Sequence, residues 1–390
     1  MYNGEKQIDR PLRWGMVGGG RTGQVGYKHR TGALRDGTTY RLVCGAFDVD
    51  AARGCDFGLN LGVPATATTP RRRTRDIMKL SICTDVMGDL AFADMLDKCV
   101  ELGVEGIEMT GGGWSKGPHF RADALLADKA KLTAALKEIE ARGLGIAALN
   151  CSANPLDPGP MGARHRKEME ETVRLAGEIG VRTVVTMSGL PAAAPGDTVP
   201  NWLVYTTSWP DEMPERDRYQ WEDCAFPFWE KMVKLADEVG VEKYALENFS
   251  AMLVWNPETL FRLRDGVGPK IGMNLDPSHL IWMGADPLAG ARALGPAIHH
   301  CHGKDTRIER GLADVNGLLE LKKVTDVANR TWNYVAVGAG QDLQWWKEFF
   351  SVVRMVGYNG WVSLEMEDFT MSTEAGIQSS IDALQATISR

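Results

Sequence analysis

From residue 78 onward, short apolar runs alternate with longer segments in which apolar residues recur every three or four positions. The short runs predict β-strands, whereas the longer spacing predicts amphipathic helices. Two predicted helices, 127–143 and 166–180, end in glycine, which commonly stops a helix. The predicted strands span residues 79–83, 104–110, 145–150, 182–188, 243–248, 270–276, 297–302 and 360–367.

Eight strands that alternate with helices across residues 78–390 predict an α/β fold, the parallel (β/α)8 or TIM barrel. Residues 1–77 have a different pattern. A strand-like run leads into Gly18, Gly20 and Gly23, and a second strand-like run ends at Asp48. This G-x-G-x-x-G spacing, followed by an acidic residue, is typical of the turn that binds a dinucleotide.

The glycine-rich stretch resembles the start of the Gfo/Idh/MocA family of sugar dehydrogenases over residues 11–64. A complete nucleotide-binding sheet needs at least twice this length. We therefore predict a short, partial Rossmann-like βαβ fragment at residues 1–77, truncated and with no bound nucleotide cofactor. The basic run 71–75 reads as a linker to the barrel.

Composition and charge argue against some classes of function. The first 77 residues carry 13 Lys and Arg against 7 Asp and Glu, so the rest must carry −13 to give the total of −7. Such an acidic body is a poor partner for nucleic acid, which argues against an apurinic endonuclease. No apolar run is long enough to span a membrane, and the seven cysteines are scattered without a CxxC pair. We expect a cytoplasmic protein.

Candidate chemistry lies at the carboxyl ends of four consecutive predicted strands, where TIM barrels carry their active sites. Glu247, Asp276, His302 and Glu365 occupy these ends. Three carboxylates and one imidazole suit a divalent cation, with Mn²⁺ favoured and Mg²⁺, Co²⁺ or Zn²⁺ as alternatives. The four residues therefore predict a metal site at the mouth of the barrel.

The stretch "AIHHCHGKDT" contains three histidines in four positions. His302 ends the predicted strand and is the expected ligand. Because side chains alternate along a strand, His300 should point the same way one layer deeper. His299 and Cys301 should face the surrounding helices.

The motifs "LEN", "NLDPSHL", "HCHGKD" and "SLEMED" resemble those of xylose-isomerase-like barrels, in the sugar phosphate isomerase/epimerase family. The branch includes ketose 3-epimerases, inosose dehydratases and 3-keto-glycoside eliminases. The resemblance implies that Glu247 and Glu365 also exchange protons with the substrate, and that His279 binds it. It further implies a substrate-binding arginine, for which Arg307 and Arg310 are candidates. Glu108, at the end of the second barrel strand, either reaches the substrate or has a helix-facing or salt-bridged role, and it is kept as a candidate for substrate binding. Lys304 is a further candidate for substrate binding.

These assignments predict an isomerase or epimerase that abstracts a proton α to the carbonyl of a keto-sugar, through an enediolate. The alternative is a lyase that acts on a 3-keto-glycoside or inosose. A further interpretation is a non-enzymatic sensor that binds a nucleotide and a sugar. It requires that residues 1–77 bind the nucleotide cofactor. Two long segments, 190–223 and 305–342, either contact a large sugar substrate or pack as lids or homo-oligomer contacts. The first contains Trp202, Tyr205, Trp209, Tyr219 and Trp221.

Overall fold

The computed structural model describes residues 2–3, 6–7, 12–17, 28–29, 40–46, 51–61, 63, 77–204 and 211–389. The chain divides into two compact units, Met1–Asp76 and Ile77–Arg390. The predicted glycine fingerprint, Asp48 and the basic run 71–75 lie outside the described residues.

The smaller unit contains a parallel pair of strands, β3 (Leu12–Val17) and β4 (Tyr40–Ala46). Helix α2 (Ala51–Asn60) follows them in the chain. Met16, Leu42 and Val63 form a small buried core. Strands β1 (Tyr2–Asn3) and β2 (Lys6–Gln7) form a further antiparallel pair among the described residues of this unit.

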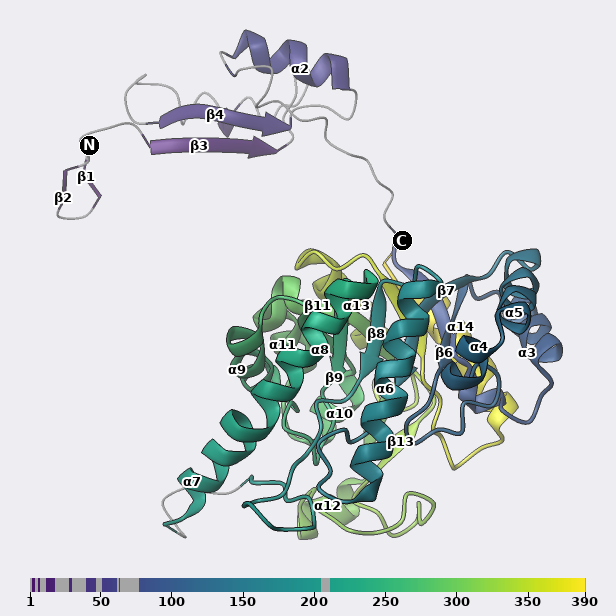
Figure 1. Ribbon diagram of the computed structural model, residues 1–390. Coiled ribbons are helices and arrows are strands. Elements are labelled where there is room, and N and C mark those ends of the chain that lie inside the picture. Colours follow the sequence, from purple (N-terminus) through teal and green to yellow (C-terminus); the bar gives the residue numbers. More distant parts are fainter. Residues whose placement is uncertain are drawn as a thin grey trace. The chain divides into compact units, whose positions relative to one another are not determined.

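The larger unit is a closed barrel of eight parallel strands, which confirms the predicted fold (Figure 1). Each predicted strand agrees with an observed one to within a few residues. In spatial order the strands are β5 (Lys79–Cys83), β6 (Gly106–Thr110), β7 (Gly145–Cys151), β8 (Thr183–Thr186), β9 (Lys243–Glu247), β10 (Ile271–Leu275), β11 (Ile298–Gly303) and β14 (Trp361–Leu364).

Helices surround the barrel (Figure 1). The second predicted helix begins at Pro160 rather than at residue 166, because proline is well suited to the first turn of a helix. The α-helices of this unit are α3 (Phe92–Glu101), α4 (Ala122–Ala127), α5 (Lys129–Ala141), α6 (Pro160–Glu178), α7 (Met213–Arg218), α8 (Phe226–Val239), α9 (Pro257–Val267), α10 (Pro277–Trp282), α11 (Pro287–Leu294), α12 (Arg310–Asn316), α13 (Leu343–Met355) and α14 (Thr373–Thr387). The part of this unit that the structure describes also contains η2 (Thr84–Met87), the π-helix η3 (Tyr219–Ala225) and η4 (Gly295–Ala297).

The interior of the barrel is apolar on one side and polar on the other. Small side chains of β7, β8 and β9 form a buried cluster of Ala148, Val185 and Ala245. Across the barrel, the hydroxyl groups of Ser81 and Ser363 are hydrogen-bonded at 2.8 Å. Larger apolar side chains of the strands pack outward into the main hydrophobic core with the helices. The polar side can therefore hold the buried charged residues described below.

Trp361, the first residue of β14, lies at the amino-terminal end of the barrel. Its indole lies against Gly106 and Gly145, where an added Cβ would come within 2.6 Å and 3.1 Å of the ring. Glycine at these paired positions of β6 and β7 lets the ring reach across the strands. Trp361 remains partly exposed and lines a cavity of about 760 Å³ at this end.

The chain makes an excursion between β11 and α13. Strands β12 (Asp305–Ile308) and β13 (Trp332–Val335) form an antiparallel hairpin that carries α12 in its long connection. The hairpin packs on α10, where the indoles of Trp332 and Trp282 are stacked with centroids 4.6 Å apart. The excursion thereby brings a second layer of side chains to the carboxyl end of the barrel.

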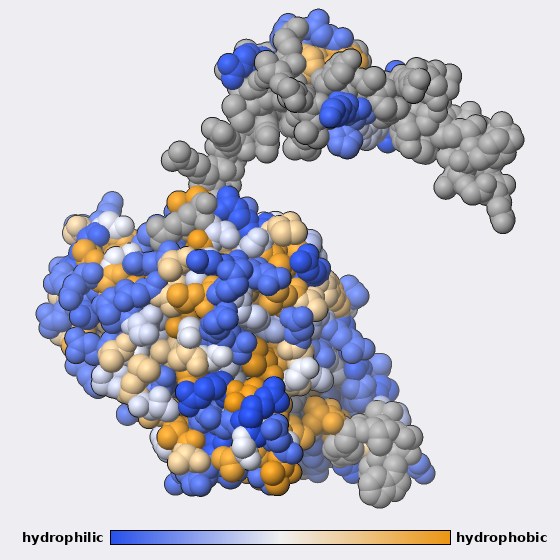
Figure 2. All heavy atoms as spheres, turned by 180° about the vertical axis from the view of Figure 1, so that it is seen from behind, coloured by the Kyte–Doolittle hydropathy of each residue, from blue (hydrophilic) through white to orange (hydrophobic). Residues whose placement is uncertain are grey.

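The surface of the barrel unit is mixed in polarity. Figure 2 shows hydrophilic residues interspersed with small apolar areas on the face in view. Among the described residues, no helix is both long and apolar enough to cross a lipid bilayer.

Candidate active site

Four side chains from consecutive strands meet at the carboxyl end of the barrel. Glu247 ends β9, Asp276 follows β10, His302 lies in β11 and Glu365 follows β14. One potential ligand atom from each residue lies within 4.8 Å of the others. The structure therefore brings together all four residues that the sequence suggested as metal ligands.

Only one of the two carboxylate oxygens of Asp276 accepts a hydrogen bond. Its Oδ1 accepts a hydrogen bond from the backbone N–H of Ser278 and caps helix α10. Its Oδ2 is fully buried and has no hydrogen-bond partner. His279 Nε2 lies 3.3 Å from this oxygen but makes its hydrogen bond to Glu247 instead. A buried, unpaired carboxylate oxygen is costly unless a cation or proton satisfies it.

The two ring nitrogens of His302 face in opposite directions. Nδ1 faces the cluster, 3.1 Å from Glu365 Oε2 and 4.0 Å from Asp276 Oδ2. Nε2 faces into the barrel, 3.3 Å from both carboxylate oxygens of Glu108. A metal-binding histidine commonly donates its other N–H to a carboxylate, which fixes the ring and its tautomer. This arrangement leaves Nδ1 as the atom available to a cation.

Glu108, at the centre of the polar side of the barrel, is only 1% exposed. It interacts with His302 and His300, and it accepts a hydrogen bond of 2.7 Å from Asn150 Nδ2. Burial opposes its ionisation, but the two imidazoles hold the pKa of Glu108 well below the usual value. Its carboxylate is thus directed at protein donors. The sequence had left open a substrate contact and a helix-facing or salt-bridged role, and the contacts seen are salt bridges to His300 and His302.

The histidine cluster divides as the alternation of the strand predicted. His300 and His302 both reach Glu108, so they point the same way. His299 points outward, where its Nδ1–H donates to the carbonyl oxygen of Tyr244. Cys301 is buried in the core between the strands and the helices.

Lys304 is a buried cation beside the four-residue cluster. Its side chain is 3% exposed, and Nζ lies 3.1 Å from Glu365 Oε2 and 2.5 Å from Glu367 Oε2. Burial alone would lower the pKa of Lys304, but these two carboxylates raise it well above the usual value. The ammonium also lies 4.3 Å from the centre of the Tyr334 ring, which favours a cation.

The two glutamates of the cluster have opposite pKa shifts. Burial, followed by the charge of Glu365, raises the pKa of Glu247 to about 8. Burial also opposes ionisation of Glu365, but the ammonium of Lys304 and the hydrogen bond from His302 hold its pKa well below the usual value. The two carboxylates therefore lie in unlike environments although they belong to one cluster.

His279 is fully buried between the cluster and the inserted hairpin. Its Nε2 lies 2.8 Å from Glu247 Oε1, and the hydroxyl of Tyr334 lies 3.1 Å from its Nδ1. If Tyr334 donates to Nδ1, the proton of the neutral ring resides on Nε2 and points at Glu247. Tyr334 was not singled out from the sequence, because it comes from an insertion and no motif surrounds it.

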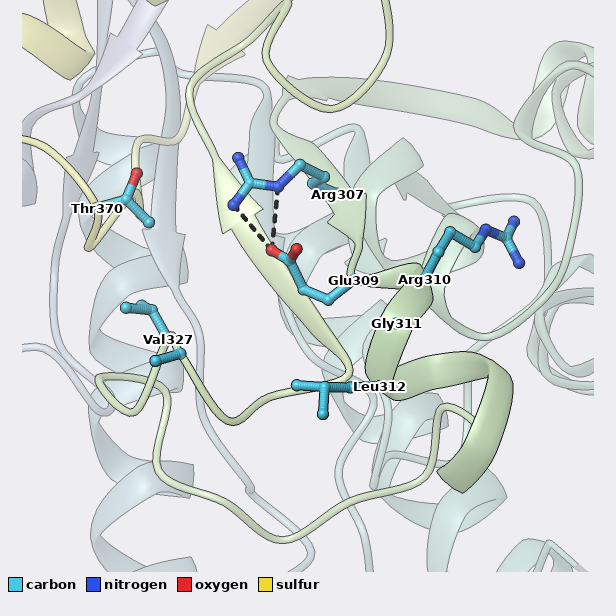
Figure 3. Close-up of a pocket in the computed structure, with 8 residues that line it drawn as sticks. Arg307, Glu309, Arg310, Gly311, Leu312, Val327 and Thr370 are labelled. Atoms are coloured by element: carbon cyan, nitrogen blue, oxygen red, sulfur yellow. Dashed lines mark hydrogen bonds and ion pairs between the residues drawn. The ribbon is translucent and has the colours of Figure 1, made fainter.

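Neither arginine candidate lies in the cluster itself. Arg307 and Glu309 form an ion pair, 2.8 Å between Nη2 and Oε1, at a cavity of about 430 Å³ (Figure 3). Arg310 extends away from this pair in Figure 3, and its side chain is 77% exposed. Because side chains alternate, Arg307 lies on the face of the hairpin opposite to Tyr334.

The aromatic residues of segment 190–223 have different environments. Trp221 is 3% exposed and packs under the guanidinium of Arg262, at 4.3 Å from the ring centre. Trp202 makes an edge-on contact with Trp255. Tyr205 and Trp209 lie outside the described residues. Trp221 is therefore a packing residue and does not offer a surface for sugar stacking.

The donor set fits a divalent cation. Three carboxylates and one imidazole lie close together, and the buried Asp276 Oδ2 lacks a hydrogen-bond partner. Oxygen-rich sites with one histidine suit Mn²⁺ or Mg²⁺ better than soft-ligand metals. A second group, Cys83, Glu108 and His302, also lies within 4.8 Å. In that group Glu108 is already occupied by three protein donors.

Comparisons with known proteins agree with this architecture. The family described as xylose isomerase-like TIM barrel matches residues 96–387. The uncharacterised protein YfiH of Bacillus subtilis (strain 168) is 61% identical over 313 residues, which is 80% of this chain and all of that protein. The uncharacterised oxidoreductase YfiI of the same organism is 64% identical over 74 residues, 19% of each protein, so the chain spans about a fifth of it.

Solved structures show the same fold at low sequence identity. The probable 3-DHS dehydratase AsbF of Bacillus anthracis has a TM-score of 0.55 at 20% identity, covering 79% of this chain and 99% of that one. A Mycobacterium smegmatis barrel in complex with magnesium has a TM-score of 0.52 at 15% identity, covering 80% and 96%. The E. coli 3-keto-D-glucoside 4-epimerase YcjR has a TM-score of 0.51 at 14% identity, covering 79% and 99%.

Proposed function

Because the chain belongs to the xylose isomerase-like TIM barrel family, we propose that it is a divalent-metal-dependent epimerase or isomerase of keto-sugars. The observation that carries this proposal is the convergence of Glu247, Asp276, His302 and Glu365, with one buried carboxylate oxygen unpaired. Mn²⁺ is the proposed metal. Solved neighbours include a sugar epimerase and a barrel with magnesium, which supports this class of function.

A cation held by these four residues would stabilise the negative charge that develops on a substrate carbonyl oxygen. Glu247 and Glu365 would exchange protons with the substrate. One carboxylate removes the proton α to the carbonyl, and the other returns a proton on the opposite face. Return to the same carbon gives an epimer, and return to the neighbouring carbon gives an isomer.

The surrounding residues would orient the substrate and the two glutamates. His279 directs an N–H at Glu247 and is held by Tyr334, so it can hold that carboxylate in place while contacting a sugar hydroxyl. Lys304 is held by Glu365 and Glu367 and would place a positive charge beside the reacting oxygen atoms. Arg307 is proposed to bind a more distant part of the substrate from the cavity on the inserted hairpin.

A second candidate is a lyase that acts on a 3-keto-glycoside or inosose. The same proton abstraction ends in elimination when a leaving group lies β to the carbanion. The likeness to a probable 3-DHS dehydratase favours this alternative, since dehydration begins with the same step. Product analysis separates the two candidates, because only the lyase releases an aglycone or water.

The test is turnover of keto-sugars in deuterated water. We expect the full chain loaded with Mn²⁺ to place solvent deuterium on the carbon α to the carbonyl of D-fructose or methyl 3-keto-β-D-glucoside, as seen by NMR. Treatment with a chelator should abolish exchange, and added Mn²⁺ should restore it. Exchange that persists after complete metal removal, or no exchange with any keto-sugar in the loaded protein, would contradict the proposal.

We propose that residues 1–77 are a partial nucleotide-binding fold without a cofactor role. The parallel pair β3–β4 and the similarity to one fifth of an oxidoreductase support this assignment. Titration with NADH, followed by its fluorescence, tests it. Saturable binding would show that the segment retains a nucleotide site.

A further inference from the structure

An exposed tryptophan lies in the loop that leaves the carboxyl end of β6. Trp114 belongs to the sequence "GGGWSKG" between β6 and α4, and it is 46% exposed. Because this loop follows a carboxyl strand end, it lies on the same side of the barrel as the four-residue cluster. An indole left open to solvent there is available to a ligand.

The backbone that carries Trp114 is built into the fold. Gly113 has φ +92°, and an added Cβ there would lie 2.4 Å from the carbonyl oxygen of Ser152. Its N–H donates to Glu168 Oε2 at 2.8 Å, and the N–H of Trp114 donates to Ser152 at 2.9 Å. Glu168 is in turn paired with Arg121 at 3.3 Å. The loop is therefore fixed by specific contacts and presents its indole in a defined position.

A row of rings connects this indole with the cluster. The ring centre of Trp114 lies 6.3 Å from that of Phe249, and Phe249 lies 4.9 Å from His279 in a T-shaped contact. His279 in turn contacts Glu247 at 2.8 Å. Phe249 follows the "LEN" motif by one residue, so it is held next to a predicted catalytic glutamate. Trp114 is thus two ring contacts from the histidine at the cluster.

We propose that Trp114 and Phe249 form a carbohydrate-binding subsite that selects glycosides over free monosaccharides. This inference rests on the proposed function. The C–H faces of a pyranose are apolar and pack on aromatic rings, whose flat faces bury much area. A sugar whose keto group reaches the cluster would lie beside Phe249. The group attached to that sugar, an aryl aglycone or a second ring, would then lie on Trp114.

The test measures binding and needs no turnover. Phenyl β-D-glucopyranoside and D-glucose are the probes, added to the full chain loaded with Mn²⁺ and followed by calorimetry and by saturation-transfer NMR. The wild type should bind the phenyl glucoside more tightly than glucose. Trp114→Ala should weaken binding of the phenyl glucoside about tenfold, equivalent to about 1.4 kcal/mol, with little change for glucose, since the aromatic contact is lost.

Matched variants separate stacking from simple loss of bulk. Trp114→Phe should stay within about threefold of the wild type, whereas Trp114→Leu should resemble Trp114→Ala. Phe249→Leu should weaken both probes. Met355→Ala, which removes a side chain that is 68% exposed on α13, should change neither affinity. Circular dichroism checks that each variant is folded.

Three results would overturn the subsite. The first is a folded Trp114→Ala protein that binds the phenyl glucoside as the wild type does. The second is a wild type that does not bind the phenyl glucoside, and the third is an equal loss of affinity for both probes in Trp114→Ala. Because binding is read without catalysis, a protein that binds and stacks but never exchanges deuterium would refute the proposed reaction and leave the subsite standing.

Discussion

Replacing Glu108 by glutamine should weaken metal binding although Glu108 is not one of the four clustered ligands. Three donors surround its carboxylate, from His300, His302 and Asn150. An amide offers one acceptor oxygen and one NH2 group, so at least one donor would face another donor. Asn150 cannot turn its amide over cheaply, because its Oδ1 accepts two hydrogen bonds from Ser152.

The size of the loss in Mn²⁺ affinity depends on which of the three donors can adapt to the amide. His300 can change tautomer, because its Nε2 also lies 3.0 Å from Ser363 Oγ and either nitrogen can lose the proton. The remaining loss falls on His302, whose ring is then held less firmly. Removing a partner that orients a metal-binding histidine typically costs 10- to 100-fold in metal affinity. We expect about a tenfold loss, equivalent to about 1.4 kcal/mol.

The assay is Mn²⁺ titration by calorimetry, with occupancy checked by elemental analysis. The control is Ser363→Ala, which removes a partner of His300 and leaves Glu108 and His302 in contact, so its Mn²⁺ affinity should stay within about twofold of the wild type. A substrate-binding Glu108, which is one of the roles that the sequence left open, would instead raise KM in Glu108→Gln and leave Mn²⁺ affinity unchanged. That outcome would refute the positioning role.

Four further predictions test the site and the fold. His302→Ala should reduce Mn²⁺ occupancy well below one per chain by elemental analysis, and full occupancy would exclude His302 as a ligand. Glu247→Gln and Glu365→Gln should each lose about 10² to 10⁴ in turnover, because they can no longer exchange protons; near-normal rates in both would remove the proposed chemistry. Burial lowers the pKa of His299 to about 4. Between about pH 6.5 and 4 the unfolded chain therefore binds a proton that the folded chain does not. As the pH is lowered across that range, the free energy of unfolding decreases by about 3 kcal/mol. Denaturation at several pH values should show different slopes of unfolding free energy against pH for the wild type and for His299→Gln. A chain that begins at Met78 should fold and keep its turnover in the same NMR assay, and a folded but inactive product would show that residues 1–77 contribute to the site.

Most strand ends were predictable because the barrel strands are mainly short apolar runs with a polar residue at or just beyond the last position. Glu247, Asp276 and Glu365 stand at such transitions, so the sequence placed them at one end of a barrel before any contact was known. The alternation within "AIHHCH" likewise predicted which histidines face inward. Both inferences depend only on local periodicity, which a single sequence carries.

The remaining contacts depend on pairings between distant segments. Tyr334 reaches His279 because β13 pairs with β12 and the hairpin packs on α10. The spacing of residues in the sequence does not predict that pairing. The surroundings of Glu108 were also hidden, since its position at a strand end does not say which donors meet it. Its role follows from His300 and His302, which are almost two hundred residues away.

The position of the four donors along the chain has a consequence for how the barrel is completed. All four lie between residues 247 and 365, in the second half of the barrel, and Glu365 directly follows β14. This last strand joins β11 to the first strand, β5, and so closes the cylinder. A cation bound by all four residues would link the closing strand to β9, β10 and β11. Metal loading would then stabilise the closed cylinder on the side where β14 meets β11.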